Sequence, residues 1–386
     1  MKRYWAVPLS AMFLAACVSA PPAPTAQQAN ALLRDELFNA PSERIRAEDV
    51  FAVSDEMRSF LHDDIAADLN LKGNRQGLVD ALYTVGQLRL EYDTLLTRNA
   101  AEAFKARSGN CLSLVIMTAA FAKELGLPVR FQHVWASETW SRNGGVSYFI
   151  GHVNLSLGAR AYDQGFGRLG DQLTVDFLPP QETRGLSTRV IDEKTIVAMY
   201  MNNRAAESFA QGKLDDAYGW ARAAVLHDPS FLSSYNTLGV IYQRHGNYAE
   251  AEKVLTQALM KEPGNTHVIS NLTSVLIAQG RAGEARALAQ RLEQLEPDPP
   301  FVFLDRGLAA LRGGDYLGAR EQFNKEIRRA PYNDELHYWL AVAYVGLGDT
   351  DQARRELAKA LEYVTSRKNH ELYAAKLDRL RSSQIH

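Results

Sequence analysis

The chain is short of cysteine, of net charge and of long apolar runs. Its 386 residues contain 2 cysteines, Cys17 and Cys111, which give no disulfide framework, and no Cys/His spacing fits a zinc site. Lys+Arg number 43 and Asp+Glu 45, so there is no basic excess for binding nucleic acid. Beyond the N-terminal leader no run of about 18 apolar residues occurs, so we expect no further segment to span a membrane.

The N-terminus has the pattern of a bacterial lipoprotein signal over residues 1–17. Lys2 and Arg3 give a positive start, a short apolar stretch follows, and residues 14–17 read Leu-Ala-Ala-Cys. This tetrapeptide resembles the lipobox, in which cleavage precedes the cysteine and its sulfur takes a diacylglycerol. We therefore expect lipidation of Cys17 and a membrane anchor made of multiple acyl chains.

The residues after the lipobox indicate the membrane in which the protein is anchored. Residue 18 is Val rather than Asp, which by the family's rule favours the outer membrane. We therefore expect a lipid-anchored protein of the cell envelope that faces the periplasm. Residues 18–33 are small and polar and include Pro21 and Pro22, so they are expected to form a flexible tether.

A period of 34 residues runs through the C-terminal half. It is kept by prolines at positions 229, 263, 297 and 331 and by alanines at 217, 251, 285, 319 and 353. Such a period is the signature of tetratricopeptide repeats, in which each unit is a helical hairpin. Small residues such as Gly239 and Ala251 let the paired helices approach closely, and proline ends the second helix. We predict five repeats over 198–365 and a capping helix over 366–386.

The repeat array resembles a binding module. Stacked hairpins of this family form a concave surface that usually binds a peptide or a protein. The resemblance therefore implies a protein or peptide partner for residues 198–365. Acidic and basic residues are nearly balanced, so charge does not identify that partner.

Residues 34–190 combine helices with strands. Ser54 is suited to cap a helix over 55–69, whose apolar residues recur on one face, and a second helix is expected over 77–90. A third segment, over 95–104, leads toward the second cysteine. This part of the chain is therefore expected to begin with a group of helices.

Cys111 stands directly before a segment that is apolar nearly all round, residues 112–125. Such a pattern suits a central buried helix, which Gly126 would terminate. Strands are predicted to follow over 129–135, 146–157 and 173–178. A lone thiol at the start of a helix is where a nucleophile would be placed, since the helix N-terminus favours negative charge.

Four stretches of the N-terminal half read Arg-Ser-Gly-Asn-Cys-Leu-Ser-Leu at 107–114, Glu-Leu-Gly-Leu-Pro-Val-Arg at 124–130, Gly-His-Val-Asn-Leu at 151–155 and Thr-Val-Asp-Phe at 174–177. In this order they resemble the bacterial transglutaminase-like superfamily, which has a papain-like core. The resemblance implies an α+β papain/transglutaminase-like domain over 34–190, followed by the all-α repeat solenoid.

The same resemblance implies a catalytic triad of Cys111, His152 and Asp176. In such a triad the imidazole takes the thiol proton, and the carboxylate fixes the tautomer and orientation of the imidazole. The residues themselves leave two alternatives open. His133 is a rival base, and Asp163 is a rival acid, because a two-residue turn after 157 would place it on the face of His152.

These observations favour an envelope-anchored cysteine peptidase or amidase that acts on a protein or peptide held by the repeats. The alternative is a non-catalytic adaptor in which the repeats carry the function and the cysteine domain is a platform. A third possibility is crosslinking, in which an amine rather than water resolves the thioester. The histidines are scattered and no Gly-rich loop precedes a helix in the way that phosphate binding requires, so we expect no metal and no cofactor.

Overall fold

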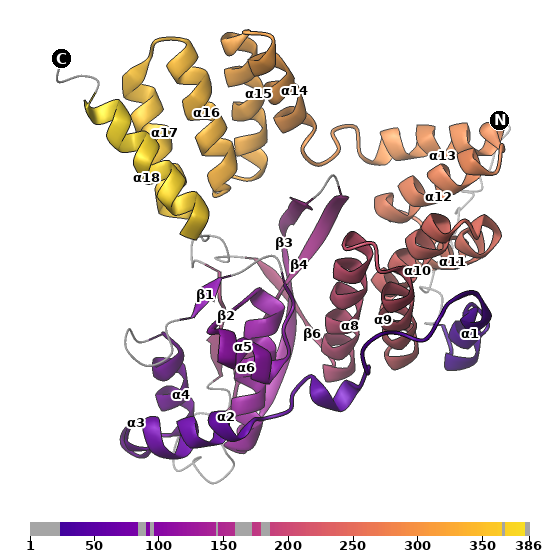
Figure 1. Ribbon diagram of the computed structural model, residues 1–386, viewed down its shortest axis with the longest axis vertical. Helices are drawn as coiled ribbons and strands as arrows, with labels where there is room; N and C mark the ends of the chain where they lie inside the picture. Colours follow the sequence, from indigo (N-terminus) through magenta and orange to yellow (C-terminus); the bar gives the residue numbers. More distant parts are fainter. Residues whose placement is uncertain are drawn as a thin grey trace, which may run out of the picture.

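The computed structural model of the protein describes residues 24–83, 90–92, 96–143, 146–158, 172–178, 186–364 and 367–382. The signal over 1–17 with its Cys17, and the rival acid Asp163, lie outside the described residues. Figure 1 shows two parts: a sheet with the helices around it, and a curved series of paired helices that runs from α8 to α18.

The N-terminal part begins with short helices and continues into strands. The helices are α1 (Ala26–Asn30), η1 (Asp35–Leu37), η2 (Ala47–Asp49), α2 (Asp55–Ser59), η3 (Phe60–Asp64), α3 (Ala66–Lys72), α4 (Asn74–Tyr83), α5 (Ala100–Ala106) and α6 (Cys111–Glu124). The strands are β1 (Glu91–Tyr92), β2 (Ser108–Gly109), β3 (Val129–Asn143), β4 (Val146–Leu157), β5 (Leu173–Val175) and β6 (Ser187–Ile191).

The helix expected over 55–69 is divided into three pieces. Ser54 caps it as expected, because its side chain accepts a hydrogen bond from the Met57 N–H at 3.3 Å. The chain then forms a π-helical turn, closed by a bond from Ile65 N–H to Phe60 O at 3.1 Å. Despite this turn, Met57 and Ile65 are both fully buried, so the apolar face survives the irregularity.

The main sheet has the strand order β5-β4-β3-β6, and all its neighbours are antiparallel. The register pairs Val134 with His152 and Leu155 with Val175. Residues 152–157 of strand β4 are buried on both faces. His152, Asn154 and Ser156 lie on one face, and the residues between them are apolar and lie on the other. Strand β3 is longer than the predicted 129–135.

Helix α6 is the centre of the N-terminal core, because every residue from Cys111 to Ala122 is buried. Phe121 contacts the rings of Phe60 and Phe104, with centroids 5.7 and 5.6 Å apart. The helix therefore has no free face, and its position is fixed from all sides.

The repeat part consists of helical hairpins. Its helices are α8 (Glu193–Ala210), α9 (Leu214–His227), α10 (Leu232–His245), α11 (Tyr248–Lys261), α12 (Thr266–Ala278), α13 (Ala282–Leu295), α14 (Val302–Arg312), α15 (Tyr316–Arg329), α16 (Asp334–Gly346), α17 (Thr350–Tyr363) and α18 (Arg367–Ser382). Gly239 of α10 shows why small residues recur, since a Cβ there would lie 2.6 Å from Leu255 of α11.

The apolar core is interrupted between the third and fourth hairpins. The main cluster reaches Ala285 of α13, and a separate cluster is built on α14, α15 and α16. The 34-residue period, counted from the start of α12, would start α14 at residue 300, but the helix begins at Val302. Pro299 and Pro300 delay it, because the residue before a proline disfavours the helical conformation. Figure 1 shows the extended connection that results.

The N-terminal segment, residues 24–50, packs along the first hairpin. This differs from the flexible tether expected as far as residue 33, because Ala29 and Leu33 are buried in the main core. Phe38 stacks on Tyr218 of α9, with ring centroids 4.0 Å apart and planes within 5°. The first three hairpins and the N-terminal part therefore share one continuous apolar core.

Candidate active site

The loop before α6 holds Cys111 at the helix start. Asn110 is the N-cap, and its Oδ1 accepts hydrogen bonds from Ser113 N–H at 2.9 Å and from Ser113 Oγ at 2.8 Å. A Cβ on Gly109 would lie 2.6 Å from the Ser113 Cβ, so this close approach requires glycine. Cys111 is a free thiol and is 2% exposed. It is therefore shielded from water and lies at the positive end of the helix dipole.

His152 of β4 lies between a carboxylate and the thiol. Its Nε2 is 2.7 Å from Oδ1 of Asp176, and the ring is 3% exposed. Burial lowers the pKa of this ring, but its hydrogen bonds with Asp176 and with Cys111, together with the charges of both groups, outweigh burial and raise the pKa to about 9. The imidazole is thus held in its charged form at neutral pH.

Asp176 immediately follows β5 and is fixed by several donors. Its Oδ2 accepts from Asn154 Nδ2 at 2.9 Å, and its Oδ1 accepts from the Leu178 N–H at 3.0 Å. Burial raises the pKa of this carboxyl, but the hydrogen bond and the charge of His152, with those two donors, bring its pKa below the usual value. Asp176 therefore remains ionised beside the imidazolium.

The structure brings three of the sequence-based candidates together and leaves another apart. His152 is hydrogen-bonded to Asp176, and Cys111 lies near enough to the His152 ring to raise its pKa, whereas His133 is paired with Val153 in the sheet and so lies on the opposite face from His152. Burial, Arg189 and His152 lower the pKa of His133, which favours its neutral form. No position is described for the rival acid Asp163.

Sequence reasoning did not include Asn154 among the site residues. It lies two residues after His152 and therefore on the same face of β4, where it is 5% exposed and donates to Asp176. That two-residue spacing within a predicted strand was the signal that could have identified it.

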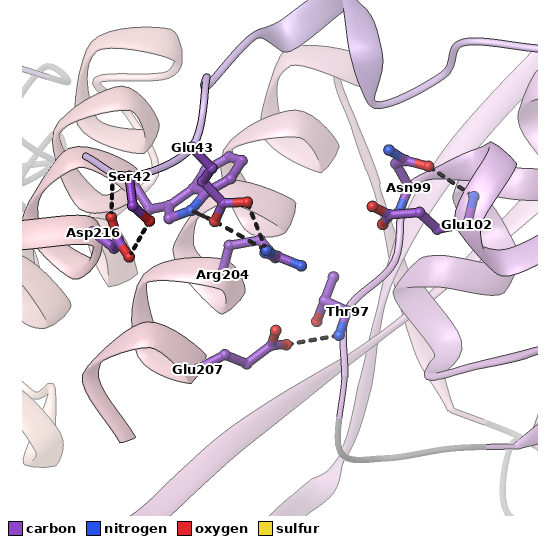
Figure 2. Close-up of polar contacts among 9 residues, drawn as sticks. Ser42, Glu43, Thr97, Asn99, Glu102, Arg204, Glu207 and Asp216 are labelled. Carbon is purple, nitrogen blue, oxygen red and sulfur yellow. Dashed lines mark hydrogen bonds and ion pairs between the residues drawn. The ribbon is translucent and has the colours of Figure 1, made fainter. Parts of the chain in front are cut away.

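A second group of polar residues joins the loop before α6, which is called the cysteine loop and includes Gly109 and Asn110, to the repeats. Thr97, which is fully buried, donates its backbone N–H to Glu207 Oε1 of α8 at 2.7 Å (Figure 2). Its Oγ1 accepts from Nδ2 of Asn110 at 2.9 Å and from Nδ2 of Asn203 at 3.2 Å. The N-cap of α6 is thus connected to the first helix of the repeats through one threonine.

The N-terminal segment makes further polar contacts with the first hairpin. Oε1 of Glu43 accepts from Trp220 Nε1 at 2.7 Å and from Arg204 Nη2 at 3.0 Å, and Figure 2 shows the contact of Glu43 with Arg204. It also shows Ser42, whose Oγ donates to Oδ2 of Asp216 at 2.8 Å. These contacts do not involve the cysteine loop.

The repeats contain a hollow between α8, α10 and α12. Its volume is about 290 Å³, and its lining comes from Phe209, Val240, Gln243, Arg244, Tyr248 and Ala278. Nearby, Asn271 Nδ2 donates to Asn236 Oδ1 at 2.9 Å. The hollow combines apolar surface with amide and guanidinium groups.

Two kinds of site are not found in the described part of the chain. Within those residues, no group of three or more His, Cys, Asp or Glu side chains is placed to hold a metal ion. Among the same residues, no helix combines the length and the apolar character needed to cross a membrane.

Comparison with known proteins identifies the repeats. The tetratricopeptide repeat family matches residues 242–301 and 310–376, which confirms the repeats predicted over that part of the chain. Tetratricopeptide repeat protein 7B of Homo sapiens is 33% identical over 113 residues, which are 28% of this chain and 13% of that protein. The TPR repeat-containing thioredoxin TDX of Oryza sativa subsp. japonica is 33% identical over 73 residues, 19% of this chain and 23% of that protein. The chain thus matches less than a quarter of either relative.

Solved structures similar to the chain include tetratricopeptide proteins. A thermophilic TPR protein of Thermus thermophilus has 19% identity and a TM-score of 0.28, with 47% of this chain and 98% of that chain covered. YrrB, a TPR protein with an unusual peptide-binding site, has 23% identity and a TM-score of 0.25, with 47% and 92% covered. PilF of Pseudomonas aeruginosa has 20% identity and a TM-score of 0.28, with 49% and 94% covered.

Proposed function

We propose that residues 34–190 form a transglutaminase-like cysteine hydrolase domain, in which Cys111 is the nucleophile, His152 the base and Asp176 the group that orients the base. The observation that supports this most strongly is the position of His152, whose Nε2 lies 2.7 Å from the carboxylate and whose pKa is raised by both Asp176 and the nearby thiol. The substrate is a protein or peptide amide, because a thiolate with an adjacent imidazolium is suited to acyl transfer.

The first chemical step is formation of a thioester. Asp176 contacts Nε2, so Nδ1 of His152 faces the thiol, and in the resting ion pair this nitrogen already holds the proton that the thiol has given up. The sulfur then bonds to the amide carbonyl carbon, and the π electrons of the carbonyl move to its oxygen, which the Cys111 N–H stabilises. When this intermediate collapses, the C–N bond breaks and the imidazolium gives its proton to the departing nitrogen.

The second step releases the acyl group. The neutral imidazole takes a proton from water as the water oxygen attacks the thioester carbon. The C–S bond then breaks, the sulfur leaves as thiolate, and the product is a carboxylic acid. An amine in place of water would give a crosslinked product, and we favour water because most bacterial relatives of this fold act as peptidases.

Thiol alkylation tests this proposal. In the full chain carrying Cys17→Ser, Cys111 is the single thiol, and we expect iodoacetamide to modify it at pH 6.5 at a rate at least tenfold above that of free cysteine, which is mostly protonated there. His152→Ala should abolish this advantage. His133→Ala is the matched control, because that histidine lies on the other face of the sheet. A wild-type rate equal to that of free cysteine, or no alkylation at all, would refute the hydrolase proposal.

The second candidate function is that of a non-catalytic adaptor. It is supported by the family match over the repeats and by the hollow beside Val240. Selection of a random displayed peptide library on the full chain tests it. Val240→Arg, which fills the hollow, should abolish selection, whereas Glu293→Arg on the exposed side of α13 should not. Equal recovery of peptides on Val240→Arg would rule out this surface.

We further propose that Cys17 carries a lipid that anchors the protein in the outer membrane. The folded part of the protein would then face the periplasm. The support is the sequence pattern over 1–17. Metabolic labelling with radioactive palmitate tests it: the wild type should be labelled and Cys17→Ser should not. Equal labelling of both would place the lipid elsewhere.

A further inference from the structure

Thr97 occupies an unusual place between the cysteine loop and the repeats. It comes 14 positions before Cys111 in the sequence and is fully buried. A buried hydroxyl and a buried backbone N–H both need partners, because an unpaired polar group in the interior is costly. Thr97 finds these partners in two different parts of the fold, α8 of the repeats and the N-cap of α6.

The contacts on the α8 side are specific. Glu207 accepts the Thr97 N–H at 2.7 Å, and one turn earlier Asn203 donates to Oγ1 at 3.2 Å. Burial raises the pKa of Glu207, and the hydrogen bonds from Thr97 oppose that rise. Figure 2 shows Glu207 reaching from α8 directly to the Thr97 backbone. Two side chains of one helix face therefore hold this residue.

The contacts on the α6 side lead to the thiol. Thr97 Oγ1 accepts from Asn110 Nδ2 at 2.9 Å, while Oδ1 of the same amide caps the helix at Ser113. The neighbouring Arg98 N–H donates to Ser113 Oγ at 2.8 Å, so the segment that contains Thr97 makes a second hydrogen bond with the start of α6. The orientation of the Asn110 amide is thus set from one side by Thr97, and Cys111 is the next residue.

We propose that Thr97 is a positioning residue, through which helix α8 of the first repeat sets the geometry and reactivity of Cys111. This inference rests on the proposed hydrolase function. Helix α8 also supplies Phe209 to the lining of the hollow between the repeats, two residues beyond Glu207. A peptide bound in that hollow would therefore contact the helix that supports Asn110 through Thr97.

The test is the pH profile of Cys111 alkylation by iodoacetamide, measured in the full chain carrying Cys17→Ser. Thr97→Val keeps the shape of the side chain and its N–H but removes the Oγ1 acceptor. We expect its alkylation rate at pH 6.5 to fall about tenfold, the change that the loss of one buried hydrogen bond gives in an equilibrium. The midpoint of its profile should also rise. Thr97→Ser, which keeps the hydroxyl, should restore the wild-type profile.

Two further variants separate positioning from general stability. Asn203→Ala removes only the donor from the repeats and should shift the profile in the same direction as Thr97→Val. Glu43→Ala removes a contact of the N-terminal segment with Arg204 and Trp220 without touching Asn110, and it should lower the melting temperature while leaving the profile unchanged.

The outcomes are distinguishable. A reactive wild type whose profile is unchanged in Thr97→Val and Asn203→Ala overturns the positioning role and leaves the hydrolase proposal in place. A profile that moves equally in Glu43→Ala also overturns it, because the effect then follows stability alone. A wild type that alkylates like free cysteine overturns the hydrolase proposal and the positioning role together.

Discussion

His152 of β4 and Asp176, the residue directly after the adjacent strand β5, meet with Nε2 and Oδ1 2.7 Å apart. Their side chains share a face because Leu155 pairs with Val175, which places Asp176 next to Asn154 and diagonal to His152. The pair is fixed by backbone register rather than by a flexible loop. A charged imidazole is therefore available beside Cys111 before any substrate binds.

Asp176→Asn should destabilise the protein in a pH-dependent way. The pKa of His152 is about 9 in the folded protein against an ordinary 6.5, so the charged ring stabilises the fold fully below pH 6.5. That contribution is lost as the pH rises through 9. Urea unfolding at pH 6 and pH 10 checks this: wild type and Asp176→Asn should differ by more at pH 6. An equal difference at both pH values would contradict the assigned pair.

Gly109→Ala should destabilise the cysteine loop. The added Cβ would lie 2.6 Å from the Ser113 Cβ, and overpacking of this kind costs about 1–3 kcal/mol. Urea denaturation measures the cost. Gly264→Ala is a control, because no atom lies within 4 Å of a Cβ at that position. Equal stabilities of the two variants would show that the loop accommodates the methyl group.

Glu356→Gln should weaken the last hairpin. Glu356 accepts from His337 Nδ1 at 2.6 Å and from Lys359 Nζ at 2.9 Å, so loss of its charge should cost about 1–3 kcal/mol at pH 7. Burial raises the pKa of Glu356, but these partners bring it below 4.5, so its stabilisation is present above pH 4.5 and is lost as the pH falls. Thermal unfolding at pH 7 and pH 3 checks this. The exposed Glu293→Gln serves as control.

Phe38→Ala should release the N-terminal segment from the first hairpin. The stack on Tyr218, with centroids 4.0 Å apart, would be lost at a cost on the order of 2 kcal/mol, less than for a fully buried phenylalanine. Limited proteolysis should then cleave residues 24–50 faster than in the wild type. Glu36→Ala, at an exposed position, should not change the cleavage rate. Unchanged cleavage of Phe38→Ala would mean that the stack contributes little.

The parts of the fold that local pattern could predict were those with strong periodicity. The 34-residue spacing gave the helical hairpins, and the apolar run after Cys111 gave a buried helix at α6. The break before α14 was not predicted, although Pro299 and Pro300 were visible in the sequence. Its cause is local, but its consequence, two separate apolar clusters, depends on packing between repeats.

The supporting residues of the site were less accessible to sequence reasoning. Asn154 could have been found from its two-residue spacing to His152. The role of Thr97 could not, because its partner Glu207 is 110 positions away and only the packing of α8 against the N-terminal part brings them together. The chemistry of single residues and the local sequence pattern therefore indicated the candidate triad. They did not indicate the hydrogen bonds that fix the triad residues in place.

The central claim is that Cys111 and His152 form a coupled pair, and an NMR titration of the His152 ring tests it most directly. We predict a pKa of about 9 in the wild type and a clearly lower pKa in Cys111→Ser, because the hydrogen bond and the charge of the cysteine both raise it. A pKa near 6.5 in the wild type, or the same pKa in both proteins, would contradict the pair.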